Sequence, residues 1–333
     1  MTIGIDTSRV TKEHLTGTEY YSLEIIKSLA KLDHKDVFLL YAQKDPRPRL
    51  GKLNSNFITK IMPFPRLWTQ FRLSWEMLAQ KPDVLYIPSH LLPLYHPDNT
   101  VVTLHDLGFK HFPELYSPIE LIYHNWGMNF SAKHAKRIIA PSEYTKKDLI
   151  STYSIDPDKI TVIWAGYNKE LFKPSDAKKK PYIFYVGRLE EKKNIVGMIK
   201  AYEILRKERS VKHKLILAGK PGLGYEKIQK TLEAVPAEIR KDIIELGYIS
   251  EKEYVKYLQE AEIFLFTTLF EGFGMPIIEA FACGTPVVTS NITSMPEIAQ
   301  NAALLVDPKN HLKIAAALSK LIHDSCLRKS LIF

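Results

Sequence analysis

Residues Phe264–Val288 read FLFTTLFEGFGMPIIEAFACGTPVV, and this stretch decides the fold that we expect. It opens with an apolar run typical of a buried strand and then reaches two glycines, Gly272 and Gly274. Pro276 suits the first turn of a helix, because its missing N–H is not needed there. Gly284 would end that helix, since a positive φ costs glycine little. The stretch therefore predicts a strand, a glycine-bracketed loop, a helix and a second strand.

The loop and the helix start have the chemistry of a ligand site. Unpaired N–H groups around Gly274 and Met275 would attract an anion such as a phosphate. Glu271 precedes the loop and Glu279 lies one turn inside the helix. Two carboxylates around bare backbone can hold a ligand that carries both phosphate and hydroxyl groups, and a nucleotide sugar is such a ligand. An ordinary strand, turn and helix with two solvated glutamates is the alternative.

The run EGFGMPIIEA resembles the E-x7-E signature of retaining glycosyltransferases with the GT-B fold, the group 1 family also called family four. The resemblance implies an α/β protein with two Rossmann-like, doubly wound parallel-sheet domains that face a cleft. It also implies that Glu271 and the backbone of Phe273, Gly274 and Met275 hold the donor sugar, and that Glu279 holds the ribose hydroxyls.

The rest of the chain independently predicts two α/β domains. Its 333 residues exceed one ordinary core, and apolar runs alternate with helical patterns, which is typical of parallel sheets. We expect an acceptor domain over 1–167, a linker over 168–181 and a donor domain over 182–333. The expected strands are Thr2–Asp6, Val37–Tyr41, Phe57–Ile61, Val84–Ile87, Val101–Leu104, Ile138–Ala140, Ile160–Trp164, Tyr182–Val186, Leu215–Ala218, Ile243–Leu246, Ile263–Phe266, Val287–Thr289 and Ala303–Val306.

Two further segments of the second domain resemble the family. YVGRLEEKKN resembles its G-R-x-x-x-x-K segment, which assigns the diphosphate to Arg188 and Lys193, unless this is only a solvated basic turn. Fixed cations there would stabilise the charge that develops on the departing nucleoside diphosphate. LGYIS resembles a loop that meets the nucleotide base through backbone groups, so Tyr248 and Ile249 are the candidates for that contact.

In the first domain, VVTLHDLGF resembles the family's V-H-D segment, in which the histidine contacts the donor sugar beside the reacting carbon. His105 takes that role by resemblance, with a structural histidine as the alternative. Asp106 either orients it or caps the following turn. Gly17 matches a glycine that brings backbone close to the donor phosphates, and a plain turn is its alternative reading.

Aromatic and aliphatic side chains at 68, 71, 75 and 78 follow a helical spacing. We expect Trp68, Phe71, Trp75 and Leu78 to be core residues. A membrane-interface helix is the alternative, since Arg66, Arg72 and Lys81 flank that face. Two spacings in the second domain, Ser250 to Glu253 and Ser294 to Glu297, predict capping boxes.

Composition restricts the partners. The net charge of +9 divides evenly, with 22 basic and 18 acidic residues in 1–174 and 24 and 19 in 175–333. This favours small anionic ligands or a mildly anionic membrane surface over nucleic acid. Two cysteines exclude a disulfide framework and fit a reducing compartment. No signal peptide or membrane span is visible, so we expect a cytoplasmic protein with at most peripheral membrane contact.

No cofactor or metal is expected. Gly219-x-x-Gly222-x-Gly224 does not match the dinucleotide fingerprint, and no phosphate-loop motif occurs. Asp156-Pro157-Asp158 has the form of a metal-binding pair, but its proline favours a turn. No histidine or cysteine cluster suggests zinc.

The predicted activity is retaining transfer of a hexose from a nucleotide diphosphate sugar to a hydroxyl of a glycan or glycolipid. The N-terminal segment and HDLGFKHFPELYSP look most like bacterial mannosyltransferases, so GDP-mannose is the first donor to consider. A non-catalytic nucleotide-sugar-binding subunit and a GT-B epimerase are the alternatives. Family members usually continue past the position of Ser330 with a helix that returns to the first domain, and we expect that helix to be absent here.

Overall fold

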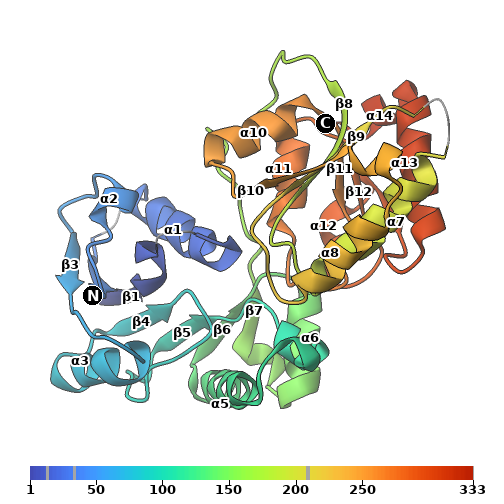
Figure 1. The fold of residues 1–333 in the computed structure, drawn as a ribbon. Helices are drawn as coiled ribbons and strands as arrows, with labels where there is room; N and C mark the ends of the chain where they lie inside the picture. Colours follow the sequence, from blue (N-terminus) through green and yellow to red (C-terminus); the bar gives the residue numbers. More distant parts are fainter. Residues whose placement is uncertain (13–14, 33–34, 208–210, 333) are drawn as a thin grey trace. The chain divides into compact units, whose positions relative to one another are not determined.

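A computed structural model of the protein describes residues 1–12, 15–32, 35–207 and 211–332 (Figure 1). The chain divides into two compact units: unit 1 contains Met1–Phe109 and Tyr116–Ala165, and unit 2 contains Lys110–Leu115 and Gly166 onward. The predicted domain over 1–167 was continuous, whereas the short segment Lys110–Leu115 groups with unit 2. The last residue of the predicted donor domain, 333, lies outside the described residues.

Unit 1 contains a parallel sheet with the strand order β3-β2-β1-β4-β5-β6-β7. The order reverses between β1 and β4, as in a doubly wound sheet, and ligands of such sheets bind at the carboxyl ends of the strands beside that reversal. The strands are β1 (Thr2–Asp6), β2 (Val37–Ala42), β3 (Phe57–Ile61), β4 (Val84–Ile87), β5 (Thr100–Thr103), β6 (Arg137–Ala140) and β7 (Ile160–Val162).

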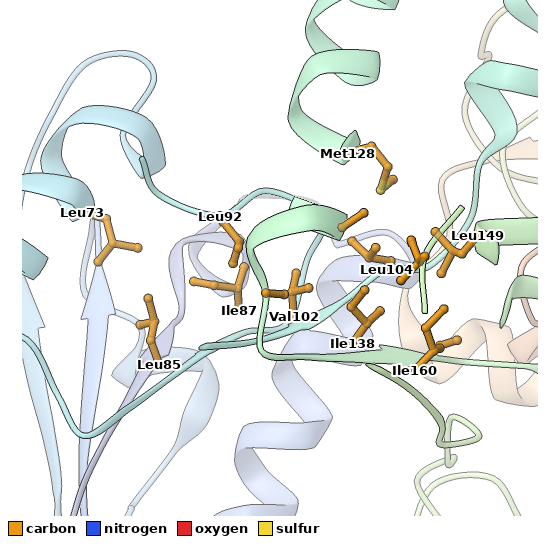
Figure 2. Close-up of a cluster of buried hydrophobic side chains, with 14 of the residues drawn as sticks. Leu73, Leu85, Ile87, Leu92, Val102, Leu104, Met128, Ile138, Leu149 and Ile160 are labelled. Atoms are coloured by element: carbon orange, nitrogen blue, oxygen red, sulfur yellow. The ribbon is translucent and has the colours of Figure 1, made fainter. Parts of the chain in front are cut away.

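Helices cover both faces of this sheet (Figure 1). One core contains Leu73, Leu85, Val102 and Met128 together with neighbouring apolar side chains (Figure 2). A second core contains Ile5, Ile26, Phe38 and Leu40, among others. The helices are α1 (Gly17–Ala30), α2 (Arg47–Leu50), α3 (Ser74–Ala79), α4 (Gly108–His111), α5 (Pro118–His134) and α6 (Glu143–Tyr153).

Unit 2 contains a second parallel sheet with the order β10-β9-β8-β11-β12-β13, and its reversal lies between β8 and β11. Its strands are β8 (Lys180–Val186), β9 (Lys214–Ala218), β10 (Ile243–Gly247), β11 (Ala261–Phe266), β12 (Val287–Ser290) and β13 (Ala303–Val306). Its helices are α7 (Ile195–Leu205), α8 (Tyr225–Ala234), α9 (Ala237–Arg240), α10 (Glu251–Glu260), α11 (Met275–Ala282), α12 (Met295–Ala299), α13 (His311–His323) and α14 (Ser325–Ser330).

The predicted fold class is confirmed in its two parallel-sheet α/β units, and each predicted strand is present with its ends shifted by at most two residues. The capping box of Ser250 and Glu253 is confirmed at the start of α10. The one predicted at Ser294 is wrong, because the Ser294 hydroxyl makes no cap bond to α12. Among the described residues, no helix is long and apolar enough to cross a bilayer.

The core position predicted for the helical segment 68–78 is also wrong in part. Trp68 is buried, but Phe71, Trp75 and Leu78 are 53%, 70% and 59% exposed. The cause is a π-helical turn, η2 (Thr69–Leu73), in which the Leu73 N–H donates to the Trp68 carbonyl at 3.0 Å. This wider turn aligns Trp68 with Leu73 and rotates the expected 3-4-3 stripe outward.

Candidate functional site

The topology of unit 2 brings two predicted ligand loops to one edge of the sheet. One loop follows β8 and contains Arg188 and Lys193, and the other follows β11 and leads through Glu271 to α11. β8 and β11 are hydrogen-bonded neighbours at the reversal point, so their carboxyl ends lie together. A backbone bond from the Leu269 N–H to the Lys192 carbonyl, 2.9 Å long, joins the loops directly.

Lys193 and Glu271 form an ion pair across these loops. Lys193 Nζ lies 2.5 Å from Glu271 Oε1, and the two side chains are only 16% and 13% exposed. Arg188, five residues earlier than Lys193, is exposed and forms no salt bridge with any residue that the structure describes. The structure therefore brings together two of the predicted donor residues and leaves a third, Arg188, open for an anion.

Glycines allow the loops after β8 and β9 to pack backbone against backbone. Gly187 and Gly219 have φ values of 144° and 151°, which residues other than glycine rarely adopt. A Cβ at Gly219 would lie 1.8 Å from the Gly187 carbonyl oxygen. This close approach requires glycine, and it fixes the backbone from which Arg188 extends.

The loop before α11 is bonded to a neighbouring serine. Gly274 precedes the helix with a φ of 104°, and a Cβ there would lie 2.7 Å from Met295 Cε. Ser294 Oγ lies 3.0 Å and 2.9 Å from the carbonyl oxygens of Glu271 and Phe273, and its one hydroxyl proton is shared between the two acceptors. The serine thus stabilises the loop before α11, which explains why it does not cap its own helix.

Glu279 lies on the second turn of α11 and is almost buried. The Tyr254 hydroxyl donates to Glu279 Oε2 at 2.6 Å. Burial raises the pKa of Glu279 to about 7, although the bond from Tyr254 opposes this shift. The carboxyl is consequently shared between its acid and its carboxylate form near neutral pH. Tyr254 was not identified from the sequence, where nothing distinguishes it from other helical tyrosines.

Tyr248 and Ile249 follow β10 directly, between the strand and the start of α10. The Tyr248 ring is 50% exposed, and Lys220 Nζ lies 5.3 Å from its centroid. The Gly219 N–H donates to the Gly247 carbonyl at 2.8 Å, which joins this loop to the loop after β9. These residues therefore form an accessible platform at the carboxyl edge of the same sheet.

In unit 1, His105 lies at the carboxyl end of β5. Its Nε2 is 2.8 Å from the Pro88 carbonyl oxygen, and because a carbonyl only accepts, Nε2 donates the proton. Burial lowers the pKa of His105, which favours the neutral ring, and in that form Nδ1 is an acceptor. Asp106 caps the following turn, accepting from the Gly108 N–H at 2.8 Å.

His90 is a second histidine at this edge that the sequence reasoning missed. Its ring centroid is 5.2 Å from that of His105, and its φ of 32° is unusual for a residue other than glycine. His90 Nδ1 is buried with no hydrogen-bond partner among the described residues. Burial and the neighbouring His105 lower its pKa to about 3. Its position just after β4, beside the strand reversal, was the available signal.

Gly17 is the first residue of α1 and not part of a separate loop. Thr16 and Glu19 form a capping box, and Glu19 Oε1 also accepts from Lys12 Nζ at 2.7 Å. Burial of Glu19 works to raise its pKa, but the bonds from Lys12 and Thr16 outweigh burial and the pKa is lowered. Apart from its chain neighbours and the backbone of α1, no atom of the described residues lies within 4 Å of a Cβ built on Gly17, so the structure leaves space beside its backbone. The Thr-x-x-Glu spacing could have revealed this cap.

The described part of the chain contains no group of three or more His, Cys, Asp or Glu side chains arranged to hold a metal ion. Asp156 accepts from the Asp158 N–H at 2.9 Å within a short 3-10 turn, η4 (Pro157–Lys159). Both aspartates thus belong to the turn that the sequence predicted from Pro157.

Two doubly wound parallel sheets, each with ligand-type loops at its carboxyl edge, are the architecture of the GT-B fold. The family model described as "Glycosyl transferases group 1" matches residues 167–332, and the model described as "Glycosyltransferase Family 4" matches residues 15–171. The chain therefore belongs to the group 1 glycosyltransferases of family four, and it is a transferase.

Curated relatives cover nearly the whole chain. O-antigen chain mannosyltransferase B of Escherichia coli is 28% identical over 96% of this chain and 90% of its own length. O-antigen chain mannosyltransferase RfbU of Salmonella typhimurium is 27% identical over 95% of this chain and 90% of its own length.

Solved structures agree in fold. Sucrose-phosphate synthase from Thermosynechococcus elongatus superposes with a TM-score of 0.77 at 17% identity, covering 99% of this chain and 92% of that chain. Anabaena HepE, solved in complex with UDP-glucose, gives a TM-score of 0.75 at 16% identity with the same coverage. At these identities, the likeness establishes the GT-B fold.

Proposed function

We propose that this transferase moves a hexose from a nucleotide diphosphate sugar to a hydroxyl of a glycan or glycolipid acceptor, with retention of the anomeric configuration. GDP-mannose is the first donor to test, because the two relatives that cover nearly the whole chain are named as mannosyltransferases. Both names also refer to the O-antigen chain, which supports a role in polysaccharide biosynthesis. UDP-glucose is the natural comparison, since the HepE complex contains it.

One observation carries the proposal: the Lys193–Glu271 pair lies in the loops at the reversal point of unit 2, and Glu271 is four residues before the start of α11. A diphosphate near Lys193 and the N-terminus of α11 meets positive charge from two sources, the ammonium group and the positive end of the helix dipole. Arg188 adds a planar donor that can hold phosphate oxygens bidentately. Charge that develops on the leaving diphosphate is stabilised there more strongly in the transition state than in the ground state.

The remaining roles follow the family resemblance. Unit 2 takes the donor and unit 1 takes the acceptor. Glu271 and the backbone of Phe273, Gly274 and Met275 hold the sugar, while Glu279 accepts from the ribose hydroxyls. Tyr248 and Ile249 contact the base, and the backbone of Gly17 approaches the phosphates. His105 contacts the sugar beside its reacting carbon.

The chemical step needs no metal and no cofactor in this proposal. The acceptor oxygen attacks the anomeric carbon on the face from which the diphosphate departs. The carbon–oxygen bond to the diphosphate breaks, its electron pair goes to the leaving oxygen, and that oxygen takes the acceptor's proton. The nearby carboxylate of Glu271 is ion-paired with Lys193, which suits it to binding better than to nucleophilic attack.

We place the enzyme in the cytoplasm, in peripheral contact with the inner face of the membrane and without a nucleic-acid partner. A panel of nucleotide sugars in a thermal-shift assay tests the donor, and GDP-mannose should raise the midpoint most. Product analysis follows with the stabilising donor. Binding without turnover would indicate a binding subunit, and free nucleoside diphosphate with an epimerised free sugar would indicate an epimerase; either result overturns the proposal.

A further inference from the structure

Unit 1 exposes large apolar side chains along the segment from β3 through α3. Their exposed fractions range from 36% for Phe64 to 70% for Trp75. Ile58 shares its strand face with Lys60, which pairs with Glu76 of α3. We name the set the β3–α3 surface, and it consists of Ile58, Phe64, Leu67, Phe71, Trp75 and Leu78. Soluble proteins rarely expose so many neighbouring apolar side chains unless they bind something there.

The same segment concentrates the positive charge of the unit. Residues 44–81 contain eight Lys and Arg but two Asp and Glu, whereas the rest of 1–174 contains fourteen and sixteen. The even division between the halves of the chain conceals this concentration. Both acidic residues are neutralised: Glu76 is buried and pairs with Lys60 and Arg72, and Asp45 pairs with Arg47 at 2.7 Å.

The segment that carries the β3–α3 surface therefore also carries cations without an ion pair. Lys44, Arg66 and Lys81 are exposed, and none forms a salt bridge with a residue that the structure describes. Aromatic rings surrounded by Lys and Arg suit the interface of a bilayer, where the rings enter the headgroup level and the cations meet anionic lipids.

Buried side chains and a hydrogen bond anchor the backbone of the β3–α3 surface. Trp68 Nε1 donates to the Met62 carbonyl at 2.7 Å, and Leu73 and Met77 are buried beneath the same segment. These anchors fix the π-helical turn that directs Phe71 and Trp75 outward. Because the exposed rings stand on anchored backbone, binding does not first require the segment to fold.

We infer that the β3–α3 surface docks unit 1 on a bilayer that contains anionic phospholipids. The inference rests on the peripheral membrane contact proposed above, and not on the identity of the donor or on turnover. A second copy of the chain is a poorer occupant, because symmetric pairing through this surface would oppose two cationic patches.

Vesicle flotation with the full chain tests the inference. The protein should float with vesicles of phosphatidylcholine and phosphatidylglycerol, stay behind with phosphatidylcholine alone, and be released by salt. The triple variant Phe71→Ser/Trp75→Ser/Leu78→Ser and the variant Arg66→Glu/Lys81→Glu should each weaken vesicle binding about tenfold. The control is Leu312→Ser/Lys313→Glu, an exposed pair on α13 of unit 2 that should bind as wild type does.

Three results would overturn the inference: no flotation of the wild-type chain, equal flotation of the surface variants, or concentration-dependent dimerisation that the triple variant abolishes without any vesicle binding. Donor hydrolysis in solution is measured in parallel, because it reports the transferase proposal separately. Loss of flotation with unchanged hydrolysis in the variants is the expected combination. Absence of hydrolysis in every protein would count against the transferase proposal and leave the docking result standing.

Discussion

Lys193 Nζ and Glu271 Oε1 lie 2.5 Å apart, although 78 residues separate them in the chain. They come from the loops after two hydrogen-bonded strands, β8 and β11, at the point where the strand order of unit 2 reverses. The topology of the sheet thus brings together the cation that we propose for the diphosphate and the carboxylate that we propose for the sugar. The predictions below test what this assembly does.

Replacing Lys193 or Arg188 with alanine should reduce turnover sharply. Each change removes a cation aimed at charge that develops on the leaving group, and such a contact is worth on the order of 3 kcal/mol in the transition state, or roughly a hundredfold in rate. Steady-state kinetics with the preferred donor measures the effect. Lys241→Ala, which removes an exposed lysine elsewhere in unit 2, is the matched control.

Lys193→Ala also leaves Glu271 without its partner, so stability must be separated from catalysis. The variant Lys193→Ala/Glu271→Gln removes both charges and should unfold at nearly the wild-type midpoint while turnover stays low. If Lys193→Ala or Arg188→Ala turns over as fast as the wild-type chain, the replaced residue does not stabilise the leaving diphosphate.

Glu279→Gln should make the protein more stable at pH 8 than the wild-type chain. The folded-state pKa of about 7 lies above the ordinary 4.5, so the folded chain binds the proton more tightly than the unfolded chain does. The wild-type chain then loses stability as pH rises from about 4.5 through 7, by up to about 3 kcal/mol. Glutamine still accepts the hydrogen bond from Tyr254. Because it does not titrate, the variant does not lose this stability as pH rises.

Thermal unfolding at pH 5 and pH 8 measures this difference, and Glu233→Gln, an exposed glutamate of α8, is the control. The stability advantage of Glu279→Gln should grow between the two pH values. An advantage that is the same at both would show that the carboxyl does not titrate in this range. Donor affinity should fall in Glu279→Gln, and an unchanged affinity would remove the ribose role.

Ser294→Ala should weaken donor binding through the loop before α11. The buried hydroxyl bonds to the carbonyls of Glu271 and Phe273, and leaving them unpaired costs about 1–3 kcal/mol of stability. Thr289→Val removes a similar buried bond, from Thr289 Oγ1 to the Phe266 carbonyl, outside this loop. Calorimetric titration should show reduced donor affinity for Ser294→Ala only, and equal affinities in both variants would contradict the role of the loop.

Excess chelator should leave activity largely unchanged. In our proposal Arg188, Lys193 and the start of α11 offset the charge of the diphosphate, which is the task that magnesium or manganese performs elsewhere. Initial rates with and without EDTA measure this, with added magnesium as the comparison. A rate that collapses in EDTA and returns with the metal would show that the proposed cations are insufficient.

The strands could be read from the sequence because buried parallel strands are continuous apolar runs. Their order and the reversal points came only from the structure. Because the end of each apolar run marks the end of a strand, His105 and Arg188 could also be placed at strand ends. His90 was missed because its contact with His105 is made by the fold, and its position after β4 was not used as a signal. The outward turn of Phe71 and Trp75 was missed because a single π-helical turn shifts the buried face, and spacing alone does not reveal it.

The central claim is that the chain transfers the sugar of a nucleotide donor with retained configuration. The most direct measurement is NMR of the product formed from GDP-mannose labelled at the anomeric carbon, with a panel of glycan and glycolipid acceptors. We predict a new α-mannosidic bond formed in step with released GDP, and a large loss of both in Arg188→Ala/Lys193→Ala. A β-linked product, or an intact donor with every acceptor and every nucleotide sugar tried, would contradict the account.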